Sequence, residues 1–351
     1  MPANSIDFSI IIPVKNGLPR LERLLDSIAK NRPENISCEI VVSDDGSEED
    51  VRPVCDRHNA VTLRSEKSEG PAAARNAGAR IARGECFLFM DADVVYEAGL
   101  LEKAKQLLDG DPELQAVSFF SQKCHPGDNT VQNFVASIEH FWFLKFIEPG
   151  KRSGAIKGFT TRNGAIRREA FESVGGFDAS FKTNAHEDYD FGKRLTQRNK
   201  CVLVREPVIY HAFPDRLTRL MRNYFVRASL FVPYYLRNRP ALDPAQTSSR
   251  EALLRMIGGL GALFLVLSIL PMSFSWVWRL LFLLCVLYYG YCITDFLKSA
   301  YKWSGRNAIF AAKCALIHYG SSFVILAGGM WGLLAFLRQW LSARGREAPA
   351  R

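Results

Sequence analysis

The 351-residue sequence lacks the features that mark several common classes of protein. Its eight cysteines form no C-x-x-C pair and have no histidines at zinc-site spacing, so we predict neither a disulfide framework nor a zinc site. The segment Met1 to Asp7 is polar and has no apolar run of the kind found in a cleavable signal peptide. No G-x-G-x-x-G or Walker loop follows the first predicted strand, which argues against a dinucleotide dehydrogenase and a P-loop NTPase.

Charged side chains are also missing from three long apolar stretches near the C-terminus: Met256–Phe274, Leu280–Thr294 and Cys314–Leu337. A helix that spans a membrane needs about 20 apolar residues. The first and third stretches reach that length, and the second does so if Arg279 and Asp295 lie at the interfaces. We therefore predict a transmembrane region of about three helices at 255–338 and a basic tail at 339–351. A buried helical domain is the alternative.

The net charge of +9 is concentrated beside this apolar region and not on a separate module. That placement favours a membrane face with anionic headgroups and argues against a nucleic-acid partner. We predict an amphipathic interfacial helix and linker at 216–254, with Pro233 ending or kinking the helix. Packing of this helix onto the preceding domain is the alternative. The expected location is the cell (inner) membrane, as a multi-pass protein whose catalytic domain is cytoplasmic.

The positions of the basic segments along the chain are inconsistent with three membrane-spanning helices. The segment before Met256 and the loop Lys298–Arg306 are both expected on the cytoplasmic side. Three spans would place the basic residues after Leu337 on the opposite side. Either the third stretch is interfacial or re-entrant, or a further span exists.

Residues 1–215 alternate apolar runs typical of buried strands with charged helical segments. This alternation predicts an α/β fold with a mostly parallel sheet, whose ligands bind at the carboxyl ends of the strands. The predicted strands are Phe8–Val14, Cys38–Ser43, 60–64, Cys86–Met90 and 114–120, and the predicted helices are Gly17–Lys30, Gly70–Ala82 and Glu97–Leu108.

Two acidic clusters follow these strand ends. Asp44 and Asp45 follow the second strand, where an acid commonly hydrogen-bonds the ribose or base of a nucleotide. Asp91 and Asp93 follow the fourth, and two such carboxylates can share Mg²⁺ or Mn²⁺, which in turn binds a diphosphate. Polar turns often contain a lone D-x-D, so the evidence lies in finding both clusters on neighbouring strand ends.

Other side chains have the chemistry that a group-transfer reaction needs. Each of them also has a purely structural explanation. Arg75 lies in a small-residue helix and could face a phosphate, although simple helix packing explains the segment equally well. Glu187 and Asp188 begin a helix, where acids interact favourably with the helix dipole, or where one could act as a general base. His211 follows a predicted strand at Val208–Tyr210; a lone histidine is usually structural, but its neutral ring can bind a metal.

Together these segments resemble the family 2 glycosyltransferases with the GT-A fold. The resemblance runs from Ile10 to about His211. Six motifs carry it: IPVKNG at 12–17, VSDDGS at 42–47, GPAAARNAG at 70–78, MDAD at 90–93, VGGFD at 174–178 and HEDYD at 186–190.

The resemblance implies an inverting, metal-dependent transfer of a sugar from a nucleotide sugar. Asp44 and Asp45 would hold the base and ribose, and Asp93 would be the closer metal ligand. Glu187 and Asp188 would supply the catalytic base, with Asp188 favoured. The other implied positions are Pro13, Asn16, Arg75 and Asp91 at the donor, Asn163 and Gly164 in a loop that closes over the sugar, and Asp91 and His211 at the metal.

The Q-x-x-R-W motif of processive synthases in this family is absent, because Leu195–Lys200 reads LTQRNK. We therefore expect a single transfer to a lipid or lipid-linked acceptor. A polyprenyl phosphate acceptor, already an anion, would need no base and would leave the role of Asp188 open. Two other classes remain as alternatives: a nucleotidyltransferase, although its glycine-rich basic loop is missing, and a non-catalytic membrane-bound scaffold that binds a ligand.

Overall fold

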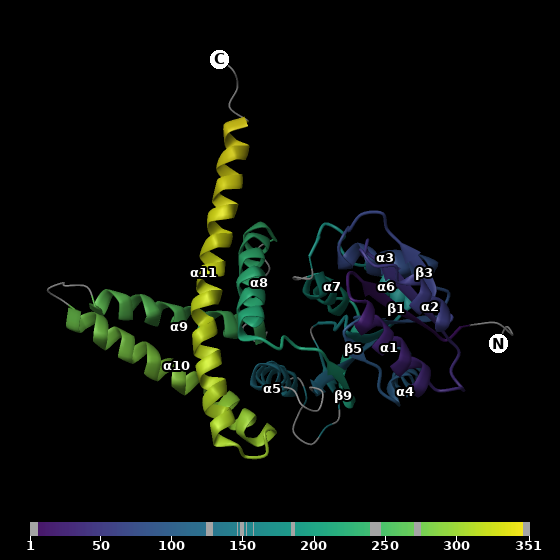
Figure 1. Cartoon of the computed structure of the whole chain (residues 1–351), viewed down its shortest axis with the longest axis horizontal. Helices are drawn as coiled ribbons and strands as arrows, with labels where there is room; N and C mark the ends of the chain where they lie inside the picture. Colours follow the sequence, from purple (N-terminus) through teal and green to yellow (C-terminus); the bar gives the residue numbers. More distant parts are fainter. Residues whose placement is uncertain are drawn as a thin grey trace. The chain divides into compact units, whose positions relative to one another are not determined.

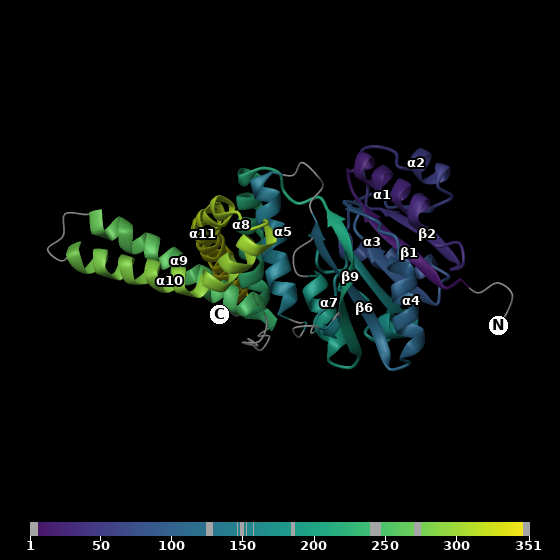
Figure 2. The same cartoon turned by 90° about the horizontal axis from the view of Figure 1, so that it is seen from below.

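The computed structural model describes residues 6–123, 129–145, 147, 151, 153–156, 158–183, 187–238, 247–269 and 275–346. The chain divides into two compact units. The first unit comprises Met1–Gly127 and Trp142–Phe213, and the second comprises Asp128–Phe141 and Pro214–Arg351. Figures 1 and 2 show the elements of each unit.

The first unit is an α/β domain built around one sheet. Its strand order is β3-β2-β1-β4-β8-β6-β9-β5, and β7 pairs with β9. The strands are β1 (Phe8–Val14), β2 (Cys38–Asp44), β3 (Val61–Arg64), β4 (Cys86–Met90), β5 (Val94–Val95), β6 (Leu114–Lys123), β7 (Ser153–Ala155), β8 (Asn163–Arg167) and β9 (Lys200–His211). The helices are α1 (Leu18–Asn31), α2 (Arg52–Arg57), α3 (Pro71–Ile81), α4 (Leu100–Gly110), α6 (Arg168–Ser173) and α7 (Glu187–Thr196).

The parallel part of the sheet confirms the predicted α/β fold. Strand β1 pairs in parallel with β2 and β4, and β2 pairs in parallel with β3. The apolar run Ile10–Ile12 is fully buried, as expected of a strand covered on both faces. Because β1, β2 and β4 run in one direction, their carboxyl ends meet at one edge of the sheet. That edge carries Asn16, Asp44 and Asp91 with their neighbours.

Asn163 and Gly164 correct one expectation, because both lie in strand β8 and not in a loop. Asn163 pairs with Met90, directly before Asp91, and Gly164 pairs with Phe89. A Cβ on Gly164 would come within 2.4 Å of the Thr160 carbonyl oxygen and 2.5 Å of the Phe159 ring. The strand is short and inserted antiparallel beside β4, so local periodicity did not reveal it.

A cluster of phenylalanines fixes α7 against the sheet. The rings of Phe177 and Phe191 lie 4.3 Å apart between centroids, and Phe171 lies 5.6 Å from Phe191. Phe159 meets Phe191 edge to face at 5.4 Å. Since Phe191 lies one turn into α7, this packing positions the acidic start of the helix.

The second unit is helical. Its elements are most of α5 (Thr130–Leu144), then α8 (Leu217–Asn238), α9 (Thr247–Ile269), α10 (Ser275–Trp303) and α11 (Ala308–Arg346). Helix α8 does not end at Pro233 but continues to Asn238. Within the described residues, α10 and α11 are long and apolar enough to cross a membrane, and the apolar part of α9, Ile257–Ile269, is shorter.

We predict that Gly164→Ala destabilises the protein by about 1–3 kcal/mol, because the added methyl group overpacks the contact with Thr160 and Phe159. Chemical unfolding of the full chain in detergent measures the change. Gly158→Ala is the matched control, since a Cβ at that position has nothing within 4 Å. Equal stability of the two variants would show that β8 does not pack as described.

Candidate active site

The two aspartates at the end of β2, Asp44 and Asp45, are buried and bonded within the chain. Asp44 accepts a hydrogen bond from the Ser47 amide at 2.9 Å and forms an ion pair with Arg64 at 3.2 Å. Asp45 accepts from the Ser68 hydroxyl at 2.6 Å, from the Glu69 amide at 2.6 Å and from the Gly70 amide at 3.0 Å. Asp45 therefore holds the segment that leads into α3.

The turn after β1 is tied to the turn after β2. Asn16 has a positive φ of 50°, and its amide donates to the Ser47 hydroxyl at 2.9 Å. Its side-chain carbonyl accepts from the Glu48 amide at 2.8 Å. Pro13 lies within β1, in register with Ser43. The structure thus brings Pro13 and Asn16 beside Asp44 and Asp45 at one edge of the sheet.

A buried arginine joins three distant segments. Arg75, on α3, donates to Asp91 at 2.6 Å and to Glu187 at 3.1 Å. Its guanidinium also lies 5.5 Å from the centre of the Phe177 ring. Burial disfavours the charged guanidinium, but Asp91 and Glu187 outweigh that effect and raise the pKa of Arg75. This network links α3, the carboxyl end of β4 and the start of α7.

The acidic pair at the start of α7 has two different environments. Glu187 is buried and bonded to Arg75, whereas Asp188 is half-buried. Burial and the neighbouring Asp188 carboxylate raise the pKa of Glu187 to about 7, against the opposing effect of Arg75. One Asp188 oxygen accepts from the Tyr189 amide at 2.8 Å.

A second cluster forms where β5 meets the end of β9. The His211 Nε2 atom lies 3.3 Å from an Asp93 oxygen, and Val94 pairs with His211 across the strands. Arg162 lies 3.4 Å from His211 Nδ1. An arginine can only donate, so His211 Nδ1 is the acceptor in a hydrogen bond between these two side chains. Burial raises the pKa of Asp93, but His211, Arg162 and Arg20 outweigh burial and lower it.

The three predicted metal ligands therefore do not all contact one another. Asp91 faces Arg75, while Asp93 and His211 face each other. Over the described parts of the chain, no group of three or more histidine, cysteine, aspartate or glutamate side chains is arranged to hold a metal ion.

Residues 9–175 match the protein family described as "Glycosyl transferase family 2". The chain carries a family 2 glycosyltransferase domain. An uncharacterized glycosyltransferase of Haemophilus influenzae is 29% identical over 214 residues, covering 58% of this chain and 68% of that protein. The pre-mycofactocin glycosyltransferase of Mycobacterium tuberculosis is 29% identical over 239 residues, covering 64% of this chain and 46% of that protein.

Among solved structures, this glycosyltransferase resembles the mannosyltransferase PcManGT from Pyrobaculum calidifontis, solved in complex with GDP-Man and Mn²⁺. The TM-score is 0.52 at 19% identity, and the match covers 96% of this chain and 88% of that one. At this identity the likeness concerns the fold. It agrees with the α/β domain and confirms the GT-A type of architecture that the sequence motifs predicted.

Two residues of the candidate site were missed by sequence reasoning. Arg162, beside His211, directly precedes Asn163, but nothing in the sequence marks it as a partner of a residue that far along the chain. Asn76 donates to the Phe177 carbonyl at 2.7 Å and accepts from the Phe177 amide at 2.9 Å. Its place beside Arg75 in the GPAAARNAG motif was the available signal.

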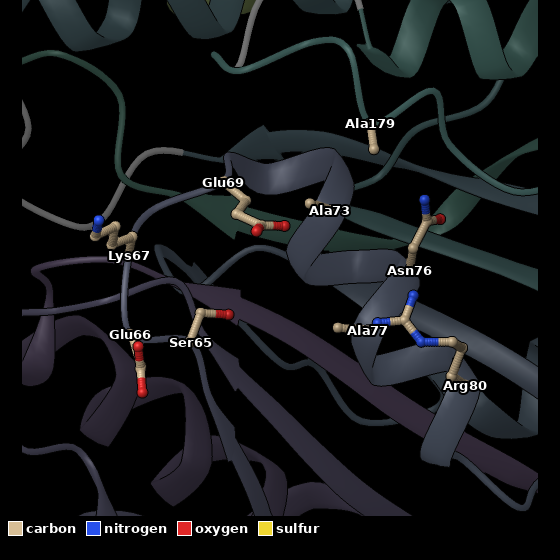
Figure 3. A pocket seen from close by; sticks show the side chains of 9 residues that line it. All are labelled: Ser65, Glu66, Lys67, Glu69, Ala73, Asn76, Ala77, Arg80 and Ala179. Atoms are coloured by element: carbon tan, nitrogen blue, oxygen red, sulfur yellow. The ribbon is translucent and has the colours of Figure 1, made fainter.

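A pocket of about 480 Å³ lies beside the segment that Asp45 holds. Figure 3 shows its lining: side chains of α3, including Asn76 and Arg80, and side chains of the 65–69 segment, including Lys67 and Glu69. None of the predicted site residues belongs to this described lining, which is open and of mixed charge. The pocket therefore lies outside the acidic clusters.

The raised pKa of Glu187 predicts a pH effect on stability. A group whose pKa rises from 4.5 to about 7 on folding contributes stability below pH 4.5, and this contribution is lost as the pH rises through 7. Glu187→Gln cannot titrate. The unfolding free energy of the wild type relative to that of this variant should fall by on the order of 2 kcal/mol between pH 5 and pH 8.

Denaturant unfolding at each pH measures this difference. Glu172→Gln, at an exposed glutamate on α6, is the matched control for the substitution. A difference between wild type and Glu187→Gln that stays constant over this range would contradict the burial of Glu187.

Proposed function

We propose that this glycosyltransferase transfers one sugar, with inversion, from a nucleotide sugar to a lipid or lipid-linked acceptor at the cytoplasmic face of the inner membrane. The observation that carries the proposal is the Arg75 network. It brings an acid from the end of β4 next to the acidic start of α7, residues that are far apart in the sequence. In this proposal the donor site and the catalytic base lie together at this edge of the sheet.

Residues at this edge fit a donor with a nucleoside diphosphate. Asp44, Asp45, Pro13 and Asn16 surround the ends of β1 and β2, where an α/β fold binds nucleotides. PcManGT, which shares the fold, holds GDP-Man. Hydrogen bonds from the turn residues already order this region.

The residues at the ends of β4 and β9 include the donor atoms that a divalent cation takes. Asp93 and His211 place an oxygen and a nitrogen 3.3 Å apart, and Asp91 is two residues away. Mg²⁺ and Mn²⁺ accept carboxylate oxygens and complete their coordination with phosphates and water. Asp91 and Asp93 would hold the ion, and His211 would join them once its proton lies on Nδ1. Such an ion stabilises a departing diphosphate.

Asp188 is the better placed of the two candidate bases. The ion pair with Arg75 occupies Glu187, which is buried, whereas Asp188 is half-buried at the first turn of α7. A carboxylate in that position can take the proton from an acceptor hydroxyl while the sugar is transferred. Glu187 then acts as a positioning residue that anchors the helix start on Arg75.

The membrane assignment rests on the helical second unit. Helices α10 and α11 are long and apolar enough for a bilayer. The domain boundaries proposed for the function are 1–215 for catalysis, 216–254 for the interfacial helix and linker, 255–338 for the membrane region and 339–351 for the tail.

A donor screen with the purified protein, radiolabelled nucleotide sugars and a membrane lipid extract tests the proposal. We expect one donor to label the lipid fraction in the presence of Mg²⁺ or Mn²⁺.

Asp93→Ala should abolish metal-dependent donor binding measured by calorimetry, because it removes the carboxylate nearest His211. Unchanged metal-dependent binding in this variant would refute the metal role of Asp93.

We predict that Asp188→Asn lowers the transfer rate at least 100-fold while donor affinity stays nearly unchanged, because it removes the base but no donor contact. Radiolabel transfer and calorimetry measure the two quantities. Asp111→Asn, which breaks an exposed ion pair with Lys200, is the matched control. Normal turnover of Asp188→Asn on a hydroxyl acceptor would exclude this residue as the base.

A further inference from the structure

The apolar helices of the second unit do not run side by side. Figures 1 and 2 show α9 and α10 as a hairpin that α11 crosses steeply, with α8 lying along α11. The free end of the hairpin extends on one side of α11, and α8 lies on the other side. A bilayer normal can therefore be aligned with the hairpin or with α11, but not with both.

Buried polar contacts fix the crossing. The Tyr289 hydroxyl, on α10, lies 2.5 Å from His318 Nδ1 and 2.8 Å from the Ser322 hydroxyl, both on α11. All three side chains are buried. On α9, a Cβ added to Gly258 would come within 2.8 Å of both Tyr289 and Ser322. The close approach leaves no room for α11 to rotate into line with the hairpin.

Small residues hold α8 against the neighbouring part of α11. A Cβ on Gly328 would come within 2.5 Å of the Phe225 carbonyl oxygen, and one on Gly332 within 2.3 Å of the Ser229 carbonyl oxygen. The two glycines lie four residues apart, on one face of α11. That face is therefore covered by α8.

Another face of α11 carries an exposed apolar stripe. Ile309, Leu316, Met330, Leu334 and Leu341 recur at helical spacing and are 52% to 75% exposed. At 1.5 Å per residue the stripe is about 48 Å long, whereas the hydrocarbon of a bilayer is only about 30 Å thick. If α11 crossed the membrane along its normal, part of the stripe would lie in water.

The hairpin is apolar on its exposed surface as well. Leu263, Val266 and Ile269 of α9 and Leu284 and Leu287 of α10 are all exposed. The hairpin and the stripe on α11 thus form an uncovered apolar surface within the described part of this unit.

The charge pattern decides between the two alignments. Basic residues lie before the hairpin in the sequence, at its end with Lys298 and Lys302, and at the end of α11 with Arg338 and Arg344. The positive-inside rule places all three segments on the cytoplasmic side. A hairpin returns to the side on which it began, and a helix that lies along the surface keeps both ends there.

We propose that only the α9–α10 hairpin enters the hydrocarbon of a bilayer with anionic headgroups, and that α11 lies along its cytoplasmic surface with the apolar stripe facing the lipid. This inference rests on the membrane attachment in the proposed function. It replaces three spans by one inserted hairpin, and it removes the conflict between the basic C-terminus and an odd number of spans.

Cysteine labelling in sealed membrane vesicles of known orientation tests the inference. In a cysteine-free background that retains transferase activity, Lys302→Cys marks the end of α10 and Ser342→Cys marks the end of α11. A membrane-impermeant maleimide should label both from the cytoplasmic side alone. Labelling of the two positions from opposite sides would overturn the inference, while the proposed transferase activity would stand.

The depth of the stripe gives an independent measurement. Nitroxide labels at Leu316→Cys, Met330→Cys and Leu341→Cys should report similar, shallow depths from their accessibility to oxygen and to a water-soluble nickel complex. Depths that pass through a maximum at Met330 would indicate a spanning α11 and overturn the inference. A chain recovered in the soluble fraction, with every site open to the maleimide, would instead refute membrane attachment itself.

Discussion

The candidate site depends on one buried guanidinium that pairs with two carboxylates. Arg75 lies between Asp91 and Glu187, and neither acid has another cation at comparable distance among the described ion pairs. Breaking a buried ion pair leaves an uncompensated charge, which typically costs 3–5 kcal/mol. The pair therefore fixes where α7 begins relative to β4. The same bond occupies Glu187, whereas the neighbouring Asp188 is half-buried.

The local sequence pattern was sufficient to predict the strands of the parallel half of the domain. Strands β1, β2 and β4 are buried on both faces, so their apolar runs are continuous, and β2 and β4 lead directly into the acidic clusters. The pattern failed for β8, which is short and has Asn163 and Gly164 at its start. It also shortened β9, whose polar residues interrupt the apolar run.

The contacts within the site could not be predicted in the same way. Arg75 and Glu187 are 112 positions apart, and nothing in helical or strand periodicity pairs them. Arg162 reaches His211 only because β8 and β9 belong to one sheet. The family motifs named most of the relevant positions, but the bonds that occupy Asp45 and Glu187 come from the fold. In the helical unit, apolar composition predicted helices, whereas small residues such as Gly258 and Gly332 set their directions.

The most direct test of this account is a double-mutant cycle between Arg75 and Glu187, measured as unfolding free energies of the full chain in detergent. Arg75→Met leaves Glu187 buried without its cation, and Glu187→Gln leaves Arg75 with Asp91 as its one remaining acid, so the double variant should lose less stability than the sum of the two single losses. We expect a coupling energy of about 1–3 kcal/mol. Strictly additive losses would show that the two side chains do not interact, and would contradict the network on which the site depends.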